Sequence, residues 1–545
     1  MLIIKLFRVF SINYINIMGI PSYFSQLVRN YSEVIKQYEN LNKKVNHFYL
    51  DCNSIVYDSV RQIEIFENQQ EFEKLLIQMV CSKIEEYVSV IQPIDTVFVA
   101  FDGVAPVAKL EQQRNRRYKS NFLSKITNNL KKSEQNWKLA SITPGTTFMK
   151  NLSTTIILHF KNKKNKLGTA RVIVSTSEEP GEGEHKLYEY IRNNPDKHKN
   201  KITVIYGIDA DLIMLCLNHL PICNQLYLYR ETPYFIKSLC KDLEPEKCYL
   251  LDIPKLANLI LKKMNNYRES NFVHEKNKLY DYIFLCFLLG NDFMPHSPYV
   301  NIRTSGIDIL MNTYASLFKD EKKNLCDGKI IHWDNVRTLL EDLAKNEELY
   351  FQDEFKIRNK WEKRNFSSKT HEDKMARFDN IPIKHRDIEK LIDPFSQGWR
   401  ERYYKHLFGF DPCEDYIQRA CLNYLEALEW TFKYYSDDCY NWRWCYEYNY
   451  APLFSDLVKY IPLFNTQLLE KQPKLPIHPN VQLAYVLPKD YHDLLPERVN
   501  NAIKDFQEYY PQEMSFQWAF CKYFWEGHAN LPHIDISVLE KTLKV

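Results

Sequence analysis

Up to about residue 315, short runs of β-forming residues alternate with amphipathic segments along the chain. This alternation is typical of βαβ units and predicts an α/β fold around a mostly parallel sheet flanked by helices. Three of the runs end in an aspartate, with "HFYLD" ending at Asp51, "TVFVAFD" at Asp102 and "ITVIYGID" at Asp209. The apolar run "YIFLCFLLGND" leads to Asp292 and fits either a strand or a helix. Because ligands of open α/β sheets bind beyond the carboxyl ends of the strands, we expect these aspartates to converge.

The pattern changes after residue 315. Residues 316–395 are highly charged, and "KIRNKWEKRNFSSKTHEDKMARFDN" at 356–380 predicts a solvated or mobile connection. Residues 396–545 are rich in aromatic side chains, and "EDYIQRACLNYLEALEWTFKYY" has helical periodicity. We therefore expect a second, α-leaning region there, and an exposed loop at the lysine-rich 161–166 stretch "KNKKNK".

The composition narrows the possible partners and the compartment. A net charge of only +3 over 545 residues means that nucleic-acid binding would have to come from local basic patches. The 13 cysteines are scattered without a C-x-x-C pair, which argues against a disulfide framework and indicates a reducing compartment. We expect the cytoplasm, without excluding the nucleus. No run of 18 apolar residues occurs, so we expect no membrane-spanning helix and no membrane partner.

The turn "EEPGEGEHK" at 178–186 places two glycines around two glutamates in a chain with only 13 glycines. Gly181 and Gly183 allow positive φ and close backbone approach, so the turn can aim Glu182 and Glu184 in unusual directions. Two aimed carboxylates predict a site for a hard cation. The alternative is a solvated acidic turn at the start of a helix, where glutamates favour the helix dipole.

Seven acids, most of them beside a glycine or at a predicted strand end, together predict a metal site. Crowded carboxylates repel one another unless cations neutralise them. Oxygen ligands without a histidine or cysteine cluster favour Mg²⁺ or Mn²⁺, and two such ions would catalyse phosphodiester hydrolysis. The seven are Asp51, Asp102, Glu182, Glu184, Asp209, Asp211 and Asp292.

The stretch after Asp102, "FDGVAPVAKLEQQRNRRYKS", predicts a phosphate receptor. If a helix starts near Pro106, one face carries three cations and an amide, and guanidinium groups bind phosphate in bidentate fashion. The alternative is an ordinary basic helix facing solvent. The residues of this face are Lys109, Gln113, Arg116 and Arg117.

Several longer motifs resemble the Xrn family of 5′→3′ exoribonucleases, from Met18 almost to the C-terminus. In the first part these are "MGIPSYF", "YLDCNSIVYD", "FVAFDGVAPVAKLEQQRNRRYK", "ITPGTTFM", "EEPGEGEHK", "YGIDADLIML" and "FLCFLLGNDFMPH". In the second part they are "GWRERYYKHLFGF", "NWRWCYEYNYAPLFSDL", "LAYVLPKDYHDLLP" and "FWEGHANLPHID".

The resemblance implies a PIN/FEN-like nuclease core in which the seven acids bind the metals and the basic face holds a 5′-monophosphate. It also implies that an aromatic pair stacks the first base. The family's usual histidine in that pair is Tyr57 here, which can still stack. Its partner corresponds to Trp442 or Trp444 of "NWRW", and the sequence does not decide between them.

The resemblance also implies the domain boundaries. We expect the nuclease domain at 18–315, a charged connecting region at 316–395 and the second conserved helical region at 396–545. Met18 matches the family's usual start, so residues 1–17 are either an extension or an upstream misassigned start. The chain stops soon after the second conserved region, as expected for a near-minimal catalytic unit.

The sequence thus predicts a metal-dependent enzyme with Mg²⁺ or Mn²⁺ as cofactor, two ions in the site. It would hydrolyse 5′-monophosphorylated single-stranded RNA processively to nucleoside 5′-monophosphates in RNA decay, acting as a monomer. Two alternatives remain: a flap-type, structure-specific DNA 5′ nuclease and a non-catalytic RNA-binding scaffold. Retention of all seven acids argues against the scaffold, because an unused carboxylate cluster only adds repulsion.

Overall fold

The computed structural model describes residue 20 and the ranges 22–41, 43–128, 137–161, 163, 166–319 and 323–545. The predictions for residues 1–17 and for a start at Met18 lie outside the described residues, as does half of the 161–166 stretch.

A seven-stranded sheet forms the centre of the fold, in the order β1-β7-β6-β5-β2-β3-β4. Strands β2 to β6 run parallel, and β7 and β1 add antiparallel neighbours at one edge. The α/β prediction with a mostly parallel sheet is therefore confirmed. The strands are β1 (Ile35–Lys36), β2 (His47–Asp51), β3 (Thr96–Ala100), β4 (Arg171–Ser175), β5 (Ile202–Tyr206), β6 (Gln225–Glu231) and β7 (Cys248–Asp252).

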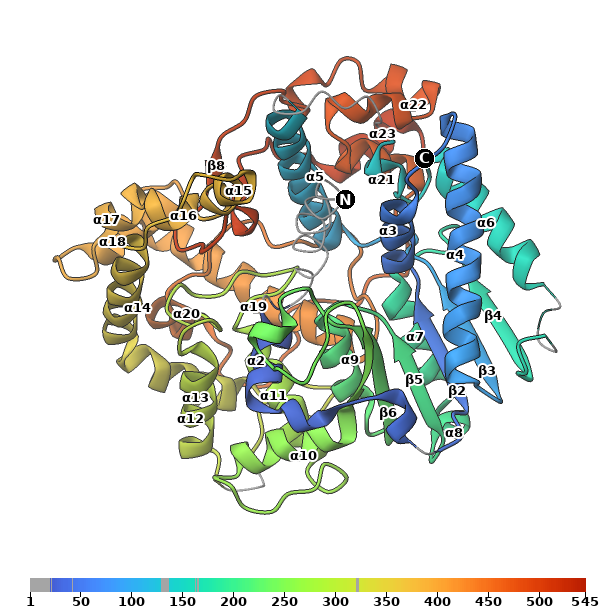
Figure 1. Cartoon of the computed structure of the whole chain (residues 1–545). Helices are drawn as coiled ribbons and strands as arrows, with labels where there is room; N and C mark the ends of the chain where they lie inside the picture. The colour runs from blue at the N-terminus through green and yellow to red at the C-terminus, as the bar shows by residue number, and fades with distance from the viewer. Residues whose placement is uncertain are drawn as a thin grey trace.

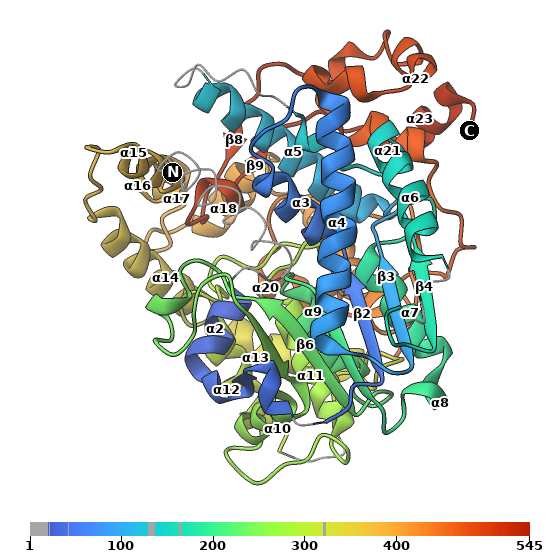
Figure 2. The ribbon, with the colours of Figure 1, turned by 45° about the vertical axis from the view of Figure 1, so that its right-hand side comes forward.

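Helices cover both faces of the sheet and thereby bury its central strands β2, β3 and β5 on both sides. Along β2, Phe48 and Leu50 join the apolar cluster under α4 and α6, whereas Tyr49 joins the cluster on the opposite face. Figure 2 shows α4 lying across one face of the strands. The helices of this part are α2 (Tyr23–Asn30), α3 (Asn53–Gln62), α4 (Gln69–Ile91), α5 (Val107–Asn128), α6 (Thr147–Phe160), α7 (Gly183–Asn193), α8 (Pro195–His198), α9 (Asp211–His219) and α10 (Ile253–Met264).

Among the described residues after β7, nearly all of the regular elements are helices, joined by long loops. The run before Asp292, which fits a strand or a helix by sequence, forms α11. The helices are α11 (Lys276–Phe287), α12 (Gly306–Leu317), α13 (Trp333–Lys345), α14 (Glu347–Glu362), α15 (His371–Asp379), α16 (Ile381–Lys384), α17 (Asp387–Ile392), α18 (Trp399–Leu407), α19 (Glu414–Ser436), α20 (Phe454–Tyr460), α21 (Pro479–Val486), α22 (Glu497–Ala502) and α23 (Ile536–Leu543). A short hairpin pairs β8 (Phe516–Gln517) with β9 (His528–Ala529).

The stretch 356–380, for which a solvated or mobile connection is predicted, is helical at both ends, and most of its charged side chains are exposed as predicted. Helix α14 covers its first part, and Arg358 is fully buried. The Arg358 guanidinium donates two hydrogen bonds, of 2.8 and 2.6 Å, to the carboxylate of Glu389 in α17. Arg358 is therefore paired in the interior, unlike its exposed charged neighbours, and a sequence cannot distinguish these two states.

The two parts of the chain share their cores. One apolar cluster contains Leu212 of α9 together with Leu425 of α19. A second joins Leu110 of α5 to Val481 of α21 and Leu539 of α23, and Figure 1 shows these C-terminal helices beside α5. The predicted domain boundaries stay a prediction. The nuclease part and the helical part are nevertheless packed against each other through these two shared apolar clusters.

Two further findings concern the compartment and membranes. All 13 cysteines lie in described parts of the chain, and all are free thiols. None of the described helices is long and apolar enough to cross a membrane.

Candidate active site

Three of the seven acids lie at the carboxyl ends of adjacent strands. Asp51 is the last residue of β2, Asp102 follows β3 by two residues and Asp209 follows β5 by three. From β2 the chain proceeds to β3 on one side and returns later to β5 on the other, so β2 and β5 border a topological switch point. Crevices at such points bind ligands in open α/β sheets.

The glycine-rich turn fits tightly against these strand ends. A Cβ atom on Gly183 would lie 2.7 Å from Oδ1 of Asp51 and 3.4 Å from Oδ1 of Asp102, so a side chain there would displace the Asp51 carboxylate. The backbone N–H of Gly183 donates a 2.7 Å hydrogen bond to Oδ1 of Asp102. Glu182 directly precedes α7, and Glu184 lies in the first turn of that helix. Both glutamate side chains are buried.

Lys109 links Glu182 to Asp292, which comes from a distant part of the chain. Its Nζ lies 2.6 Å from Oε2 of Glu182 and 2.8 Å from Oδ2 of Asp292. Asp292 reaches the site through the turn that follows α11, in which Gly290 has a φ of 83°. Asp211 is the first residue of α9 and is buried. The structure thus brings the seven predicted acids together.

The buried carboxylates disfavour one another's ionisation. Burial first, and then neighbouring carboxylates, raise the pKa of Asp51 and of Glu184 well above their usual values. Burial also raises the pKa of Asp209 to about 7, with Lys109 opposing and Asp292 adding to the rise. The pKa of Asp211 rises to about 8 through burial and Asp292. Bound cations would reverse this preference, since positive charge favours the ionised forms.

Several carboxylate oxygens are buried without a hydrogen-bond partner among the described residues. An unpaired buried carboxylate oxygen is costly, and a cation is the ligand that satisfies it. The cluster therefore fits a divalent cation, although the role of each acid as a metal ligand stays a prediction. The oxygens are Oδ1 of Asp51, Oε2 of Glu184, Oδ1 of Asp209 and Oδ1 of Asp211.

The basic face of α5 adjoins the acids but differs from its prediction in one respect. Lys109 is 5% exposed and its ammonium group is paired with two acids of the site. Burial alone would lower its pKa, but Asp292 and Glu182 raise it well above the usual value. Gln113 is also buried, whereas Arg116 and Arg117 are half-buried. The phosphate-binding role of this face is untested, and its two arginines are the most accessible members.

Tyr57 and the two tryptophans have different surroundings. Tyr57 in α3 is half-buried and packs against the apolar cluster that lies between the sheet and helices α4 and α6. Trp444 stacks on Trp430 at a centroid distance of 5.4 Å and donates a 3.2 Å hydrogen bond to Oε2 of Glu426. The indole N–H of Trp442 is buried without a hydrogen-bond partner among the described residues. The stacking role of these residues stays a prediction.

Sequence reasoning missed residues that support the acids. The amide N of Asn53 donates to Asp102, and Oδ1 of Asn53 accepts a 3.1 Å bond from the Asp102 backbone N–H. Nζ of Lys186 donates 2.8 Å bonds to the carbonyls of Phe101 and Thr176, which ties the turn to two strand ends. Both residues lie inside quoted motifs, "LDCNS" and "EGEHK", so the signal was present in the sequence.

His185 was also missed. The ligand atoms of Glu182, Glu184 and His185 lie within 4.8 Å of one another, so they could hold a metal ion together. The His185 ring stacks on Tyr434 at 3.7 Å, with an angle of 25° between the planes. Burial, followed by nearby cations such as Arg192, lowers the pKa of His185 well below its usual value, so the ring is neutral.

A cavity of about 540 Å³ opens beside the site, with Asp292 and Arg116 in its wall. It runs between α5, the turn at 289–303 and the segments 445–450 and 519–533. This volume lies within the range of ligand-binding cavities.

Comparison with known proteins identifies related sequences over nearly the whole chain. The family described as "XRN 5'-3' exonuclease N-terminus" matches residues 18–232, and "Xrn1 helical domain" matches 273–393 and 382–545. A "5'-3' exoribonuclease 2 homolog" of Drosophila melanogaster is 27% identical over 96% of this chain and 71% of its own length. A human "5'-3' exoribonuclease 1" is 27% identical over 95% of this chain, which spans only 33% of that relative. An Arabidopsis thaliana "5'-3' exoribonuclease 2" is 26% identical over 95% of this chain and 66% of its own length.

Proposed function

This chain belongs to the Xrn family, and we propose that it is a 5′→3′ exoribonuclease acting in RNA decay. Its substrate is single-stranded RNA with a 5′-monophosphate, which it degrades processively to nucleoside 5′-monophosphates. Relatives named 5′→3′ exoribonucleases support the activity. The single observation that carries it is the convergence of seven acids, with unpaired buried oxygens, beside the basic helix α5.

The acids hold Mg²⁺ or Mn²⁺, which when bound supply a more acidic water and stabilise charge on the leaving oxygen. The chain's own residues prepare this site. Gly183 holds Asp102 through its backbone N–H, and Lys109 offsets part of the charge of Glu182 and Asp292. The unpaired oxygens of Asp51 and Asp209 are buried away from bulk solvent. Their electrostatic interaction with a cation is stronger in this low-dielectric interior than it would be in water.

Arg116 and Arg117 bind the 5′-phosphate in this proposal, because they are the accessible cations of the predicted face. Burial lowers the pKa of Arg117 to about 10, with Tyr57 opposing and Arg116 adding to the effect. Arg117 therefore remains charged at neutral pH, and Tyr57 lies close enough to interact with it. A receptor that accepts only a monophosphate would exclude capped and triphosphorylated ends by crowding.

The contacts favour Trp442 over Trp444 as the partner of Tyr57. Trp444 is held by Trp430 and Glu426, whereas the N–H of Trp442 has no partner among the described residues. The Trp442 carbonyl accepts a 2.9 Å hydrogen bond from the N–H of Val107, which places its backbone at the start of the basic helix.

The remaining proposals concern the setting of the enzyme. The free thiols support a reducing compartment, and we propose the cytoplasm. We also propose that the enzyme acts as a monomer, because the predicted site is assembled within one chain.

Digestion of one RNA sequence carrying a 5′-hydroxyl, 5′-monophosphate or 5′-triphosphate, beside a 5′-flap DNA, tests the function. We expect rapid release of nucleoside 5′-monophosphates from the monophosphorylated RNA alone, and only with Mg²⁺ or Mn²⁺. The double variant Arg116→Ala, Arg117→Ala should lose the preference for monophosphate over hydroxyl. Lys125→Ala is the matched control on the same helix, where the ammonium pairs with Asp490 near the surface. Preferential cleavage of the flap DNA, or retained end discrimination in the double variant, would contradict the respective assignment.

A further inference from the structure

Two neighbouring tyrosines at the end of α19 contact the acid cluster from the helical part of the chain. The hydroxyl of Tyr434 donates a 2.8 Å hydrogen bond to Oε1 of Glu182, across 252 positions of sequence. Tyr435 lies beside Asp211, and its hydroxyl interacts with the Asp211 carboxylate. Adjacent helical residues point about 100° apart, so one helix end can reach both Glu182, just before α7, and Asp211, at the start of α9.

The contacts with the two tyrosines restrict Glu182 and Asp211 to different degrees. Glu182 is fixed through both oxygens, because Oε2 contacts Lys109 while Oε1 accepts from Tyr434. Asp211 keeps Oδ1 unpaired among the described residues, with the Tyr435 hydroxyl beside its carboxylate. Tyr435 thus restricts the carboxylate and leaves one oxygen available for a cation.

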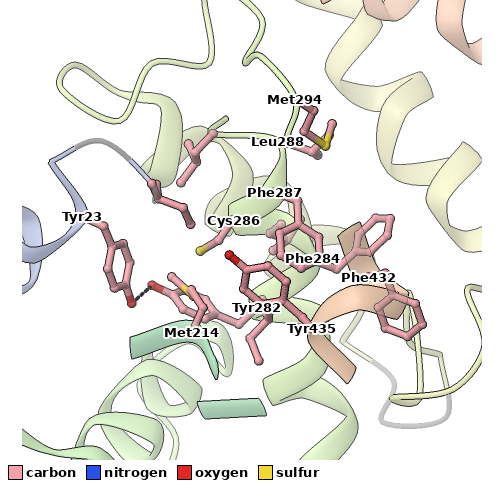
Figure 3. Packing of buried hydrophobic residues seen from close by; sticks show 14 of the residues in the cluster. Tyr23, Met214, Tyr282, Phe284, Cys286, Phe287, Leu288, Met294, Phe432 and Tyr435 are labelled. Carbon is pink, nitrogen blue, oxygen red and sulfur yellow. Dashed lines mark hydrogen bonds between the residues drawn. The ribbon is translucent and has the colours of Figure 1, made fainter. Parts of the chain in front are cut away.

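The tyrosines are themselves held rigidly. Tyr434 is 4% exposed and Tyr435 is 2% exposed. Tyr434 lies between the rings of His185, at 3.7 Å, and Trp430, at 4.7 Å. Tyr435 and Phe287 make an edge-to-face contact at 5.1 Å, and Figure 3 shows both among the buried residues of this cluster. The backbone carbonyl of Tyr435 also accepts a 3.0 Å hydrogen bond from the side-chain amide of Asn218 in α9.

A phenol suits this position because it orients a carboxylate without cancelling its charge. Burial, and then Glu182 for Tyr434 and Asp211 for Tyr435, raise the pKa of both hydroxyls well above the usual value. Both groups therefore remain neutral donors. A lysine in the same place would compete electrostatically with a bound cation.

We propose that Tyr434 and Tyr435 are positioning residues of the metal site, through which the helical part of the chain sets the affinity for divalent cations. The proposal rests on the proposed metal-dependent function. It explains physically why a nuclease core would need the helical part even where that part touches no RNA, since groups that orient metal ligands strongly affect metal binding.

The test uses the full chain and calorimetric titration with Mn²⁺ in the absence of RNA. We expect Tyr434→Phe and Tyr435→Phe each to weaken Mn²⁺ binding by about tenfold, the lower end of the range for groups that orient ligands. Tyr403→Phe is the matched control, because Tyr403 is also buried but donates its hydroxyl to the backbone carbonyl of Ala451. It should keep the wild-type Mn²⁺ affinity even if its melting temperature falls.

The rate of RNA digestion as a function of Mn²⁺ concentration gives the second readout. For the two tyrosine variants, the concentration for half-maximal rate should rise by the same factor, with the maximal rate recovered at saturation. Wild-type Mn²⁺ affinity in both variants would overturn the proposal, as would a reduced rate at all Mn²⁺ concentrations with unchanged affinity. Absence of any Mn²⁺ binding by the wild-type chain would also overturn it. Binding is measured without RNA, so failure of the proposed RNA substrate remains a separate result.

Discussion

Lys109→Met tests whether the buried lysine neutralises the metal-binding acids or serves the substrate phosphate. The variant removes a charge that lies 2.6 Å from Glu182 and 2.8 Å from Asp292, and all three side chains are at most 6% exposed. At an effective dielectric of about 20, each pair attracts by roughly 6 kcal/mol, most of which is offset by desolvation. Removing one partner of a buried pair costs about 3–5 kcal/mol, because the remaining charges are uncompensated.

This loss converts into a measurable shift. At about 2.1 cal/mol/K per residue, a 545-residue chain that unfolds as one unit has an unfolding entropy of roughly 1.1 kcal/mol/K. The melting temperature in EDTA should therefore fall by about 3–4 °C. Added Mg²⁺ should reduce the difference from wild type, because cations supply the missing positive charge and meet less repulsion in the variant.

The control is Lys119→Met on the same helix. Lys119 is also buried, but its ammonium donates to the backbone carbonyls of Trp525 and Gly527, at 2.6 and 2.7 Å. Its loss of stability should be the same in EDTA and in Mg²⁺. Thermal melts of both variants under both conditions decide the question. An equal loss for Lys109→Met with and without Mg²⁺, or no loss in EDTA, would refute the charge-neutralising role and return Lys109 to the phosphate receptor.

Three further outcomes are expected. Asp211→Asn should abolish RNA cleavage without lowering the melting temperature in EDTA, because the Asp211 carboxyl, with a pKa of about 8, is largely protonated at neutral pH and asparagine is a neutral replacement; cleavage at the wild-type rate would contradict the metal assignment. In EDTA, the free energy of unfolding should fall as pH rises from about 4 to 8, since Asp209 and Asp211 have folded-state pKa values of about 7 and 8 against an ordinary 3.8, and the folded state therefore holds their protons more tightly. Urea titrations across this range should show a smaller slope with Mg²⁺, and stability that rises with pH in EDTA would contradict the reasoning. Tyr57→Ala should cost about 1–3 kcal/mol of base stacking with little change in melting temperature, whereas Tyr57→Phe and Tyr57→His should stay active; a parallel loss of stability and activity in Tyr57→Ala would indicate a packing role.

The sequence by itself determined the sheet and the origin of its acids. Asp51, Asp102 and Asp209 could be placed at a shared edge because alternating short strands and helices predict parallel strands, whose carboxyl ends face the same way. The glycine at 183 could be recognised because close backbone approach demands a missing side chain. These inferences rest on local patterns, in which the residues that matter lie within one or two elements.

The tertiary structure alone decided which partners those residues meet. Lys109 lies on the predicted basic face, yet its partner Asp292 is 183 positions away and turns it toward the acids. The tyrosine that holds Glu182 comes from α19, and nothing near residue 434 in the sequence indicates such a role. Arg358 carries the same charge whether hydrated or paired in the interior. Contacts between distant residues leave no periodicity along the chain, so only folding brings the two groups together and fixes whether a charge is neutralised, bound to a cation or left in water.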